Sequence, residues 1–127
     1  MIMKVGFIGA GNMASAMIGG MLQKGLLQKE DIIASSATQK TAVRVAQEFG
    51  IRTTLDNKEV AKAEIVILAI KPIYCEGVIR EIRDQIGENQ IVVTIVAGRS
   101  LQWLSDPFGK PVKLIRTMPN TPALVGE

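Results

Sequence analysis

A glycine-rich stretch close to the start of the chain limits what this sequence can fold into. Residues 6–14 read GFIGAGNMA and follow directly on a short apolar run. Glycine loses more backbone freedom on folding than any other residue, so a glycine cluster beside regular structure needs a specific cause. A tight turn from a strand into a helix is such a cause. We expect a strand over 4–8 and a helix over 12–24, with Met13, Met17 and Met21 on its inward face.

Strand-like and helix-like patterns alternate along the rest of the chain. The sequence predicts further helices over 38–49 and 74–86, short helices after Asp56 and Ser100, and strands over 31–35, 51–55, 64–70, 90–96 and 112–118. Asp56 and Glu59 have the spacing of a capping box. The strand over 64–70 is apolar without alternation, as expected when both of its faces are covered. Strands that alternate with helices form parallel sheets, so we expect an α/β fold with a doubly wound parallel sheet.

Gly9 to Ala14 fits the pattern GxGxxG/A and lies between the first strand and the first helix. In that place Gly9 allows a tight turn, Gly11 lets the backbone approach a pyrophosphate, and Ala14 lets the helix pack on the sheet. The free N–H groups at the start of the helix would face the anion. A strand-to-helix turn without a ligand is the alternative. The motif therefore predicts a Rossmann-type dinucleotide-binding domain.

The end of the second strand bears on the choice between NAD and NADP. NAD sites usually carry an acid there, which binds the ribose 2′-hydroxyl. Here residues 35–38 read SSAT, and no acid follows before Glu48. Hydroxyl groups can donate to a 2′-phosphate, and Lys40 and Arg44 could add positive charge. We therefore favour NADPH, with NADH as the alternative; hydroxyls that only cap the next helix are the competing interpretation.

Composition narrows the remaining classes of function. The chain has 127 residues, a net charge of +3, one cysteine and no histidine, so we expect no metal site. Basic residues are scattered, which predicts no nucleic-acid partner. The longest apolar run, 65–70, is too short to span a bilayer, so we expect no membrane partner. With no charged leader in view and a single cysteine, we expect a cytoplasmic protein.

Three later stretches follow expected strands: AIKP at 69–72, VAG at 96–98 and RTMPNTP at 116–122. Together with FIGAGNMA they occur in the order found in Δ1-pyrroline-5-carboxylate reductases, and the chain resembles that family over its whole length. MPNTP is the most specific of these motifs. The resemblance implies a dinucleotide-binding domain over 1–118 and, over 119–127, the start of a hinge to a helical C-terminal domain that is absent from this chain.

Together with the glycine motif and the serine pair, the resemblance gives a set of candidate cofactor-binding residues. Some have a simpler interpretation: Pro72 would also end a strand, and Ala97 would also suit a plain turn. The set is Ile8, Gly9, Ala10, Gly11, Asn12, Met13, Ser35, Ser36, Asn57, Ala69, Ile70, Lys71, Pro72, Ile95, Val96, Ala97 and Asn120.

The activity that the resemblance implies is that of an oxidoreductase in proline biosynthesis, the NADPH-dependent reduction of 1-pyrroline-5-carboxylate to L-proline. A protonated imine is already a good electrophile, so no strong base is needed and we assign no catalytic residue. The resemblance implies a small imine substrate and a homo-oligomer formed through the helical domain, so we expect this chain alone to be inactive. A related 3-hydroxy-acid dehydrogenase and a non-catalytic NADP-binding module are the alternatives.

Overall fold

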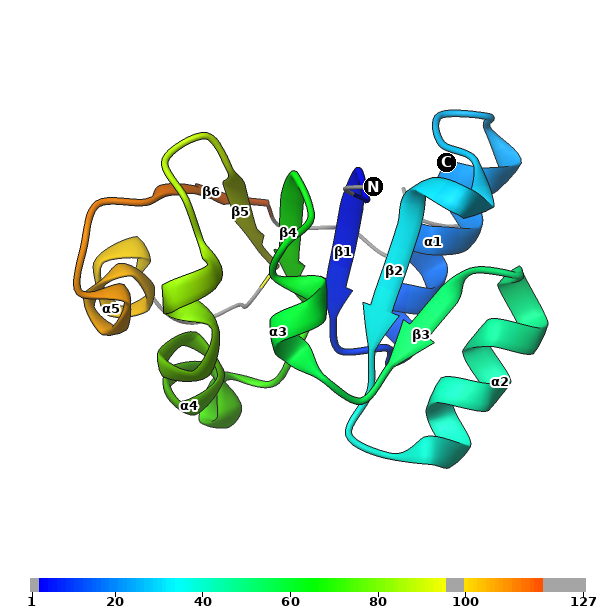
Figure 1. Ribbon diagram of the computed structural model, residues 1–127, viewed down its shortest axis with the longest axis horizontal. Helices are drawn as coiled ribbons and strands as arrows, with labels where there is room; N and C mark the ends of the chain where they lie inside the picture. The colour runs from blue at the N-terminus through cyan, green and yellow to red at the C-terminus, as the bar shows by residue number, and fades with distance from the viewer. Residues whose placement is uncertain (1–2, 96–99, 118–127) are drawn as a thin grey trace.

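The sheet in the middle of the molecule is entirely parallel (Figure 1). The computed structural model describes residues 3–95 and 100–117, and within them six strands lie in the order β3-β2-β1-β4-β5-β6. The chain starts at β1 and builds the sheet outward in both directions, so the predicted doubly wound arrangement is confirmed. The strands are β1 (Val5–Ile8), β2 (Ile32–Ser35), β3 (Arg52–Thr54), β4 (Ile65–Leu68), β5 (Ile91–Thr94) and β6 (Lys113–Arg116).

Helices and short 3₁₀ turns connect the strands. In Figure 1, α1 and α2 lie beside the half of the sheet that holds β2, while α4 and α5 lie beside the half that holds β5. The helices are α1 (Asn12–Gln23), α2 (Gln39–Phe49), α3 (Asn57–Val60), α4 (Pro72–Ile82) and α5 (Leu101–Ser105), and the 3₁₀ turns are η1 (Lys29–Asp31), η2 (Arg83–Gln85) and η3 (Asp106–Phe108).

Both faces of the sheet are buried. On one face, Phe7 of β1 packs in a cluster with Ile18 of α1 and Val45 of α2. On the other, its neighbour Ile8 packs in a cluster with Ile79 of α4. Successive side chains of a strand point to opposite faces, so a strand covered on both sides must be apolar throughout. This explains the apolar run of β4.

The largest difference from the sequence prediction concerns α4. The helix was expected over 74–86, but it begins at Pro72 and ends at Ile82, and the chain continues as the 3₁₀ turn η2. Proline suits the first helical position because its missing N–H has no partner there in any helix. Lys71 is thereby the N-cap residue of α4 and not the end of a strand.

One smaller prediction was wrong, and another is confirmed only in part. Asp56 caps α3 by accepting from the N–H of Lys58 at 3.0 Å, but Glu59 does not complete a capping box; its carboxylate pairs with Arg52 at 3.1 Å. On α1 the fully buried residues are Ala14 and Ile18. Met17 and Met21 pack only at the margin of the core, and Met13 is 36% exposed. The buried face of α1 therefore centres on Ala14 and Ile18, with Met17 and Met21 beside it.

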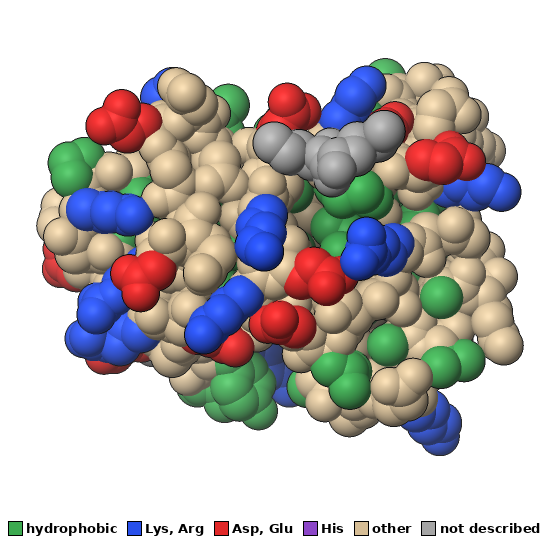
Figure 2. Space-filling view, in the orientation of Figure 1, with side chains coloured by type: hydrophobic (Ala, Val, Ile, Leu, Met, Phe, Trp, Pro, Cys, Tyr) green, Lys and Arg blue, Asp and Glu red, His purple; other side chains and the backbone are tan. Residues whose placement is uncertain are grey.

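The outer surface mixes charges of both signs. Figure 2 shows Lys and Arg interspersed with Asp and Glu on one face, without a continuous basic stripe outside the grey atoms. Within the described part of the chain, no helix is long and apolar enough to cross a membrane. The predicted hinge over 119–127 lies outside the described residues.

Candidate functional site

A cleft of about 500 Å³ opens where the strand order of the sheet reverses. Its walls come from the ends of β1 and β2, the turns after β3 and β4, and the first turns of α2 and α4. In open α/β sheets ligands bind in this crevice, outside the carboxyl ends of the strands. The lining residues are Ile8, Gly9, Ala10, Gly11, Ser35, Ser36, Ala37, Thr41, Leu55, Asn57, Ala69, Ile70, Lys71, Tyr74 and Val78.

The floor of the cleft is the turn after β1, and this turn requires glycine at position 9. Gly9 has a φ of +101°, which L side chains rarely adopt. A Cβ at this position would also collide with the backbone oxygen of Ala69 and approach Ile70 Cγ2 to 2.9 Å. The turn after β1 therefore packs directly on the turn after β4, which brings two separate motifs of the sequence together.

Gly11 is glycine for a different reason. A Cβ here would meet nothing within 4 Å, and the φ of −79° suits any residue. Gly11 is the N-cap residue of α1, it makes no side-chain cap, and the first turn of α1 holds no acidic residue. The first N–H groups of a helix attract anions when no side chain satisfies them. Open space beside an uncapped helix start fits the pyrophosphate of a dinucleotide.

A group of hydroxyls forms the wall at the start of α2. Thr38 caps the helix by accepting from the N–H of Thr41 at 3.3 Å, and Ser36 Oγ accepts from the N–H of Thr38 at 3.2 Å. The capping interpretation therefore holds for Thr38, while Ser36 and Thr41 line the cleft. Lys40 and Arg44, expected to add charge, are not among the lining residues, and Arg44 pairs with Glu48 at 3.2 Å.

A chain of side-chain hydrogen bonds runs behind the hydroxyl wall. Ser35 is 1% exposed, and its Oγ accepts from the N–H of Gly9 at 3.4 Å and donates to Asn57 Oδ1 at 2.6 Å. Asn57 in turn donates from Nδ2 to Glu81 Oε1 of α4 at 3.0 Å. Ser35 and Asn57 are thus tied to each other and to the glycine turn, as well as lining the cleft.

The remaining wall is apolar and was missed in the sequence. Leu55, Tyr74 and Val78 line the cleft, and Leu55 and Tyr74 are 52% and 57% exposed. Tyr74 and Val78 are four residues apart on α4, and together with Lys71 they share one face of the helix. Ala37 and Thr41 were missed as well. Lys71 is the charged residue among those that line the cleft.

The cleft brings together most of the predicted set. Ile8, Gly9, Ala10, Gly11, Ser35, Ser36, Asn57, Ala69, Ile70 and Lys71 line it. Asn12, Met13, Pro72 and Ile95 do not: the first three start α1 and α4, and Ile95 packs beside the α1–α2 core. Val96, Ala97 and Asn120 lie outside the described residues. Among those described, no three His, Cys, Asp or Glu residues group as a metal site.

Curated relatives of the chain include pyrroline-5-carboxylate reductases from several organisms. The chain is 36% identical over 124 residues to the pyrroline-5-carboxylate reductase of Vibrio alginolyticus, and 37% identical over 123 residues to that of Escherichia coli. These matches cover 97% and 96% of this chain but only 45% and 46% of the relatives. The chain thus spans about half the length of the curated relatives that it matches.

Solved structures agree with the sequence relatives. The fold superposes on a pyrroline-5-carboxylate reductase from Coxiella burnetii with a TM-score of 0.89 at 29% identity, covering 98% of this chain and 47% of the other. It superposes on the Plasmodium falciparum pyrroline carboxylate reductase, solved with NADP bound, with a TM-score of 0.84 at 28% identity, covering 98% and 45%. The resemblance drawn from the motifs is confirmed. A family model described as "NADP oxidoreductase coenzyme F420-dependent" matches residues 4–98, most of the chain, and the chain therefore belongs to that family.

Proposed function

We propose that this chain is the NADPH-binding part of a pyrroline-5-carboxylate reductase, which reduces 1-pyrroline-5-carboxylate to L-proline. The observation that carries the proposal is the cradle formed by Gly9, Gly11 and the uncapped start of α1. It lies in a cleft at the reversal of the sheet, in a chain whose relatives share the name of that enzyme.

Each wall of the cleft suits a different part of a dinucleotide. The N–H groups after Gly11 would bind the pyrophosphate. Ser36, Thr41 and Asn57 offer hydrogen-bond donors to the ribose 2′-phosphate, while Leu55 and Tyr74 offer apolar surface. NADPH supplies the hydride that reduces a carbon–nitrogen double bond. The chain's own part is to bind and orient the cofactor and to keep water from one side of it.

We further propose that substrate reduction needs more than this chain. By the family resemblance, residues 1–118 are the cofactor domain and 119–127 begin a hinge. The carboxylate site for the imine and the contacts of a homo-oligomer would then lie in a helical domain outside the chain. The chain alone would bind NADPH without forming proline, and it would do so in the cytoplasm.

A fluorescence titration of the chain with NADPH and, in parallel, with NADH tests the proposal. We expect saturable binding of both, with NADPH bound more tightly because hydroxyls replace the usual acid at the end of β2. Equal affinities would keep the dinucleotide site and remove the preference for NADP. Failure to bind either nucleotide would contradict the proposed function. Proline formation by the chain alone would contradict the need for a further domain.

A further inference from the structure

The fold brings an acidic residue to the cleft that the sequence order does not reveal. No acid follows the end of β2 before Glu48. Glu81, which lies near the end of α4, nevertheless accepts a hydrogen bond at 3.0 Å from Asn57, a residue that lines the cleft. An acid therefore stands directly behind the wall where the 2′-phosphate of NADPH is proposed to bind.

The hydrogen-bond chain fixes which way the Asn57 amide faces. The N–H of Gly9 can only donate, so Ser35 Oγ accepts there and gives its own hydrogen to Asn57 Oδ1. The Asn57 nitrogen must then face Glu81, whose carboxylate can only accept. Glu81 therefore accepts a hydrogen bond from the Asn57 amide, and that N–H cannot at the same time donate to a phosphate oxygen.

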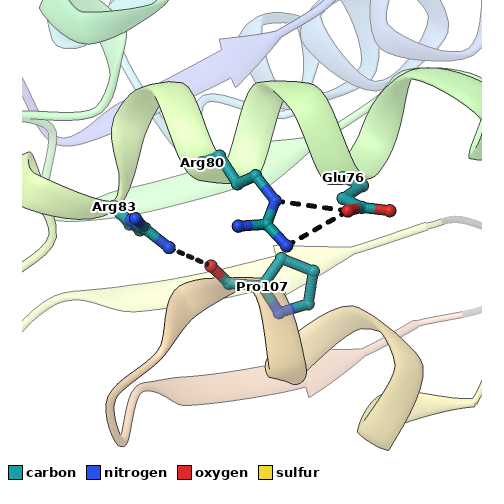
Figure 3. Close-up of polar contacts among 4 residues, drawn as sticks. All are labelled: Glu76, Arg80, Arg83 and Pro107. Atoms are coloured by element: carbon teal, nitrogen blue, oxygen red, sulfur yellow. Dashed lines mark hydrogen bonds and ion pairs between the residues drawn. The ribbon is translucent and has the colours of Figure 1, made fainter.

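The charge of Glu81 has no cationic partner among the described ion pairs. The other acid of α4 with a described contact, Glu76, pairs with Arg80 at 3.2 Å, on the side of the helix that faces Pro107 (Figure 3). The remaining described pairs join Arg44 to Glu48 and Arg52 to Glu59. Glu81 therefore places a negative charge, which no described ion pair neutralises, one residue behind the cleft wall.

We propose that Glu81 is a specificity-determining residue, which weakens binding of a 2′-phosphorylated dinucleotide relative to its 2′-hydroxyl counterpart. Glu81 acts through its negative charge and through the hydrogen bond that it accepts from Asn57. This inference rests on the proposed dinucleotide site. The hydroxyls of α2 favour NADPH, Glu81 opposes them, and the preference of the chain is the balance of the two.

Glu81→Gln tests the proposal, because it removes the charge and keeps an acceptor for Asn57. Two like charges near a protein surface repel enough to change affinity about 3- to 10-fold at low ionic strength. We expect Glu81→Gln to raise NADPH affinity by that factor and to leave NADH affinity within about two-fold. The gain should shrink as salt is added, since salt screens exposed charges. A gain in NADPH affinity that came from a structural change would not depend on the salt concentration.

Glu76→Gln is the matched control, because it makes the same change of charge on the same helix at a distance from Asn57. We expect it to leave the ratio of NADPH to NADH affinity as in the unmodified chain. Glu81→Asp keeps the charge on a shorter side chain, so its ratio should stay closer to that of the unmodified chain than the ratio of Glu81→Gln does. Because Glu76 and Glu81 are both exposed, melting curves of all three variants should closely match that of the unmodified chain.

The titrations separate this proposal from the proposed function. An unchanged ratio in Glu81→Gln, an equal gain in Glu76→Gln, or a Glu81→Gln-like ratio in Glu81→Asp would overturn the role of Glu81 while both nucleotides still bind. If neither nucleotide binds the unmodified chain, the dinucleotide site itself is wrong, and the role of Glu81 is overturned with it.

Discussion

Gly9 and Gly11 belong to one motif, but the structure gives them separate tasks. Gly9 is required by the fold, because its positive φ and its contact with Ala69 exclude a side chain. Gly11 is not required by the fold, because a Cβ there meets no protein atom within 4 Å. The space beside Gly11 is therefore available to a ligand.

Alanine at the two positions should separate stability from binding. We expect Gly9→Ala to lower the free energy of unfolding by about 3 kcal/mol, from strain at a positive φ and the collision with the β4 turn. Gly11→Ala should change it by less than about 1 kcal/mol but weaken NADPH binding at least about ten-fold, since the methyl group fills the anion cradle. Urea denaturation and the fluorescence titration measure the two quantities.

Gly20→Ala serves as the control on the same helix. A Cβ at Gly20 also meets nothing within 4 Å, but Gly20 does not line the cleft. Alanine should stabilise the helix interior by about 0.5–1 kcal/mol and leave NADPH affinity unchanged. If Gly11→Ala binds NADPH as well as Gly20→Ala does, the cradle interpretation of Gly11 is wrong.

At the scale of one element, α2 shows how a helix cap supports a binding wall formed by neighbouring residues. Thr38 holds the first turn through the N–H of Thr41, which lines the cleft, and its own N–H donates to Ser36 Oγ beside it. We expect Thr38→Ala to lower the free energy of unfolding by about 1 kcal/mol, the usual value of a lost N-cap. Urea denaturation measures this loss.

Thr38→Ser keeps a hydroxyl cap and should retain most of the stability. Because a frayed first turn displaces Ser36 and Thr41, Thr38→Ala should also weaken NADPH binding more than NADH binding. Equal stability of the alanine and serine variants would show that the cap contributes nothing measurable to α2.

The sequence predicted elements better than it predicted their ends. The glycine turn, the hydroxyls after β2 and the AIKP turn were all found, because each is a local signal next to a strand. Leu55 and Tyr74 were missed as cleft residues, and the helix expected to begin at 74 begins instead at Pro72. The contact between Glu81 and Asn57 could not be predicted from the sequence, because it depends on the packing of α4 beside α3.

At the scale of the whole molecule, alternation of strands and helices was sufficient to predict the doubly wound sheet. A strand such as β4, which is covered on both faces, must be apolar throughout. Short connections between elements also allow few strand orders. The cleft follows from that topology, since the strand order reverses between β1 and β4. The exact set of lining side chains does not follow, because it depends on where each helix starts and how closely it packs.

A ligand that binds only the folded chain must stabilise the whole molecule. At a concentration about 100 times its dissociation constant, NADPH should add about 2.7 kcal/mol to the free energy of unfolding. For a domain of this size we expect the melting temperature to rise by about 5–15 °C. Differential scanning fluorimetry with and without NADPH measures the shift, and Gly11→Ala should reduce it. An unchanged melting temperature at saturating NADPH would contradict binding to the folded chain.

The central position of β1 also determines how long this strand waits for its neighbours during synthesis. β1 leaves the ribosome before the other described strands, yet Val5 pairs on one side with Ile32 and on the other with Ile65. At about 5–20 residues per second, the second partner follows the first strand by about 3–12 s. During that interval the apolar strand at the heart of the sheet has an open edge, which is the form that aggregates or engages chaperones. The feature that places the cleft at the middle of the sheet therefore also gives β1 a longer wait for its second partner than any other described strand.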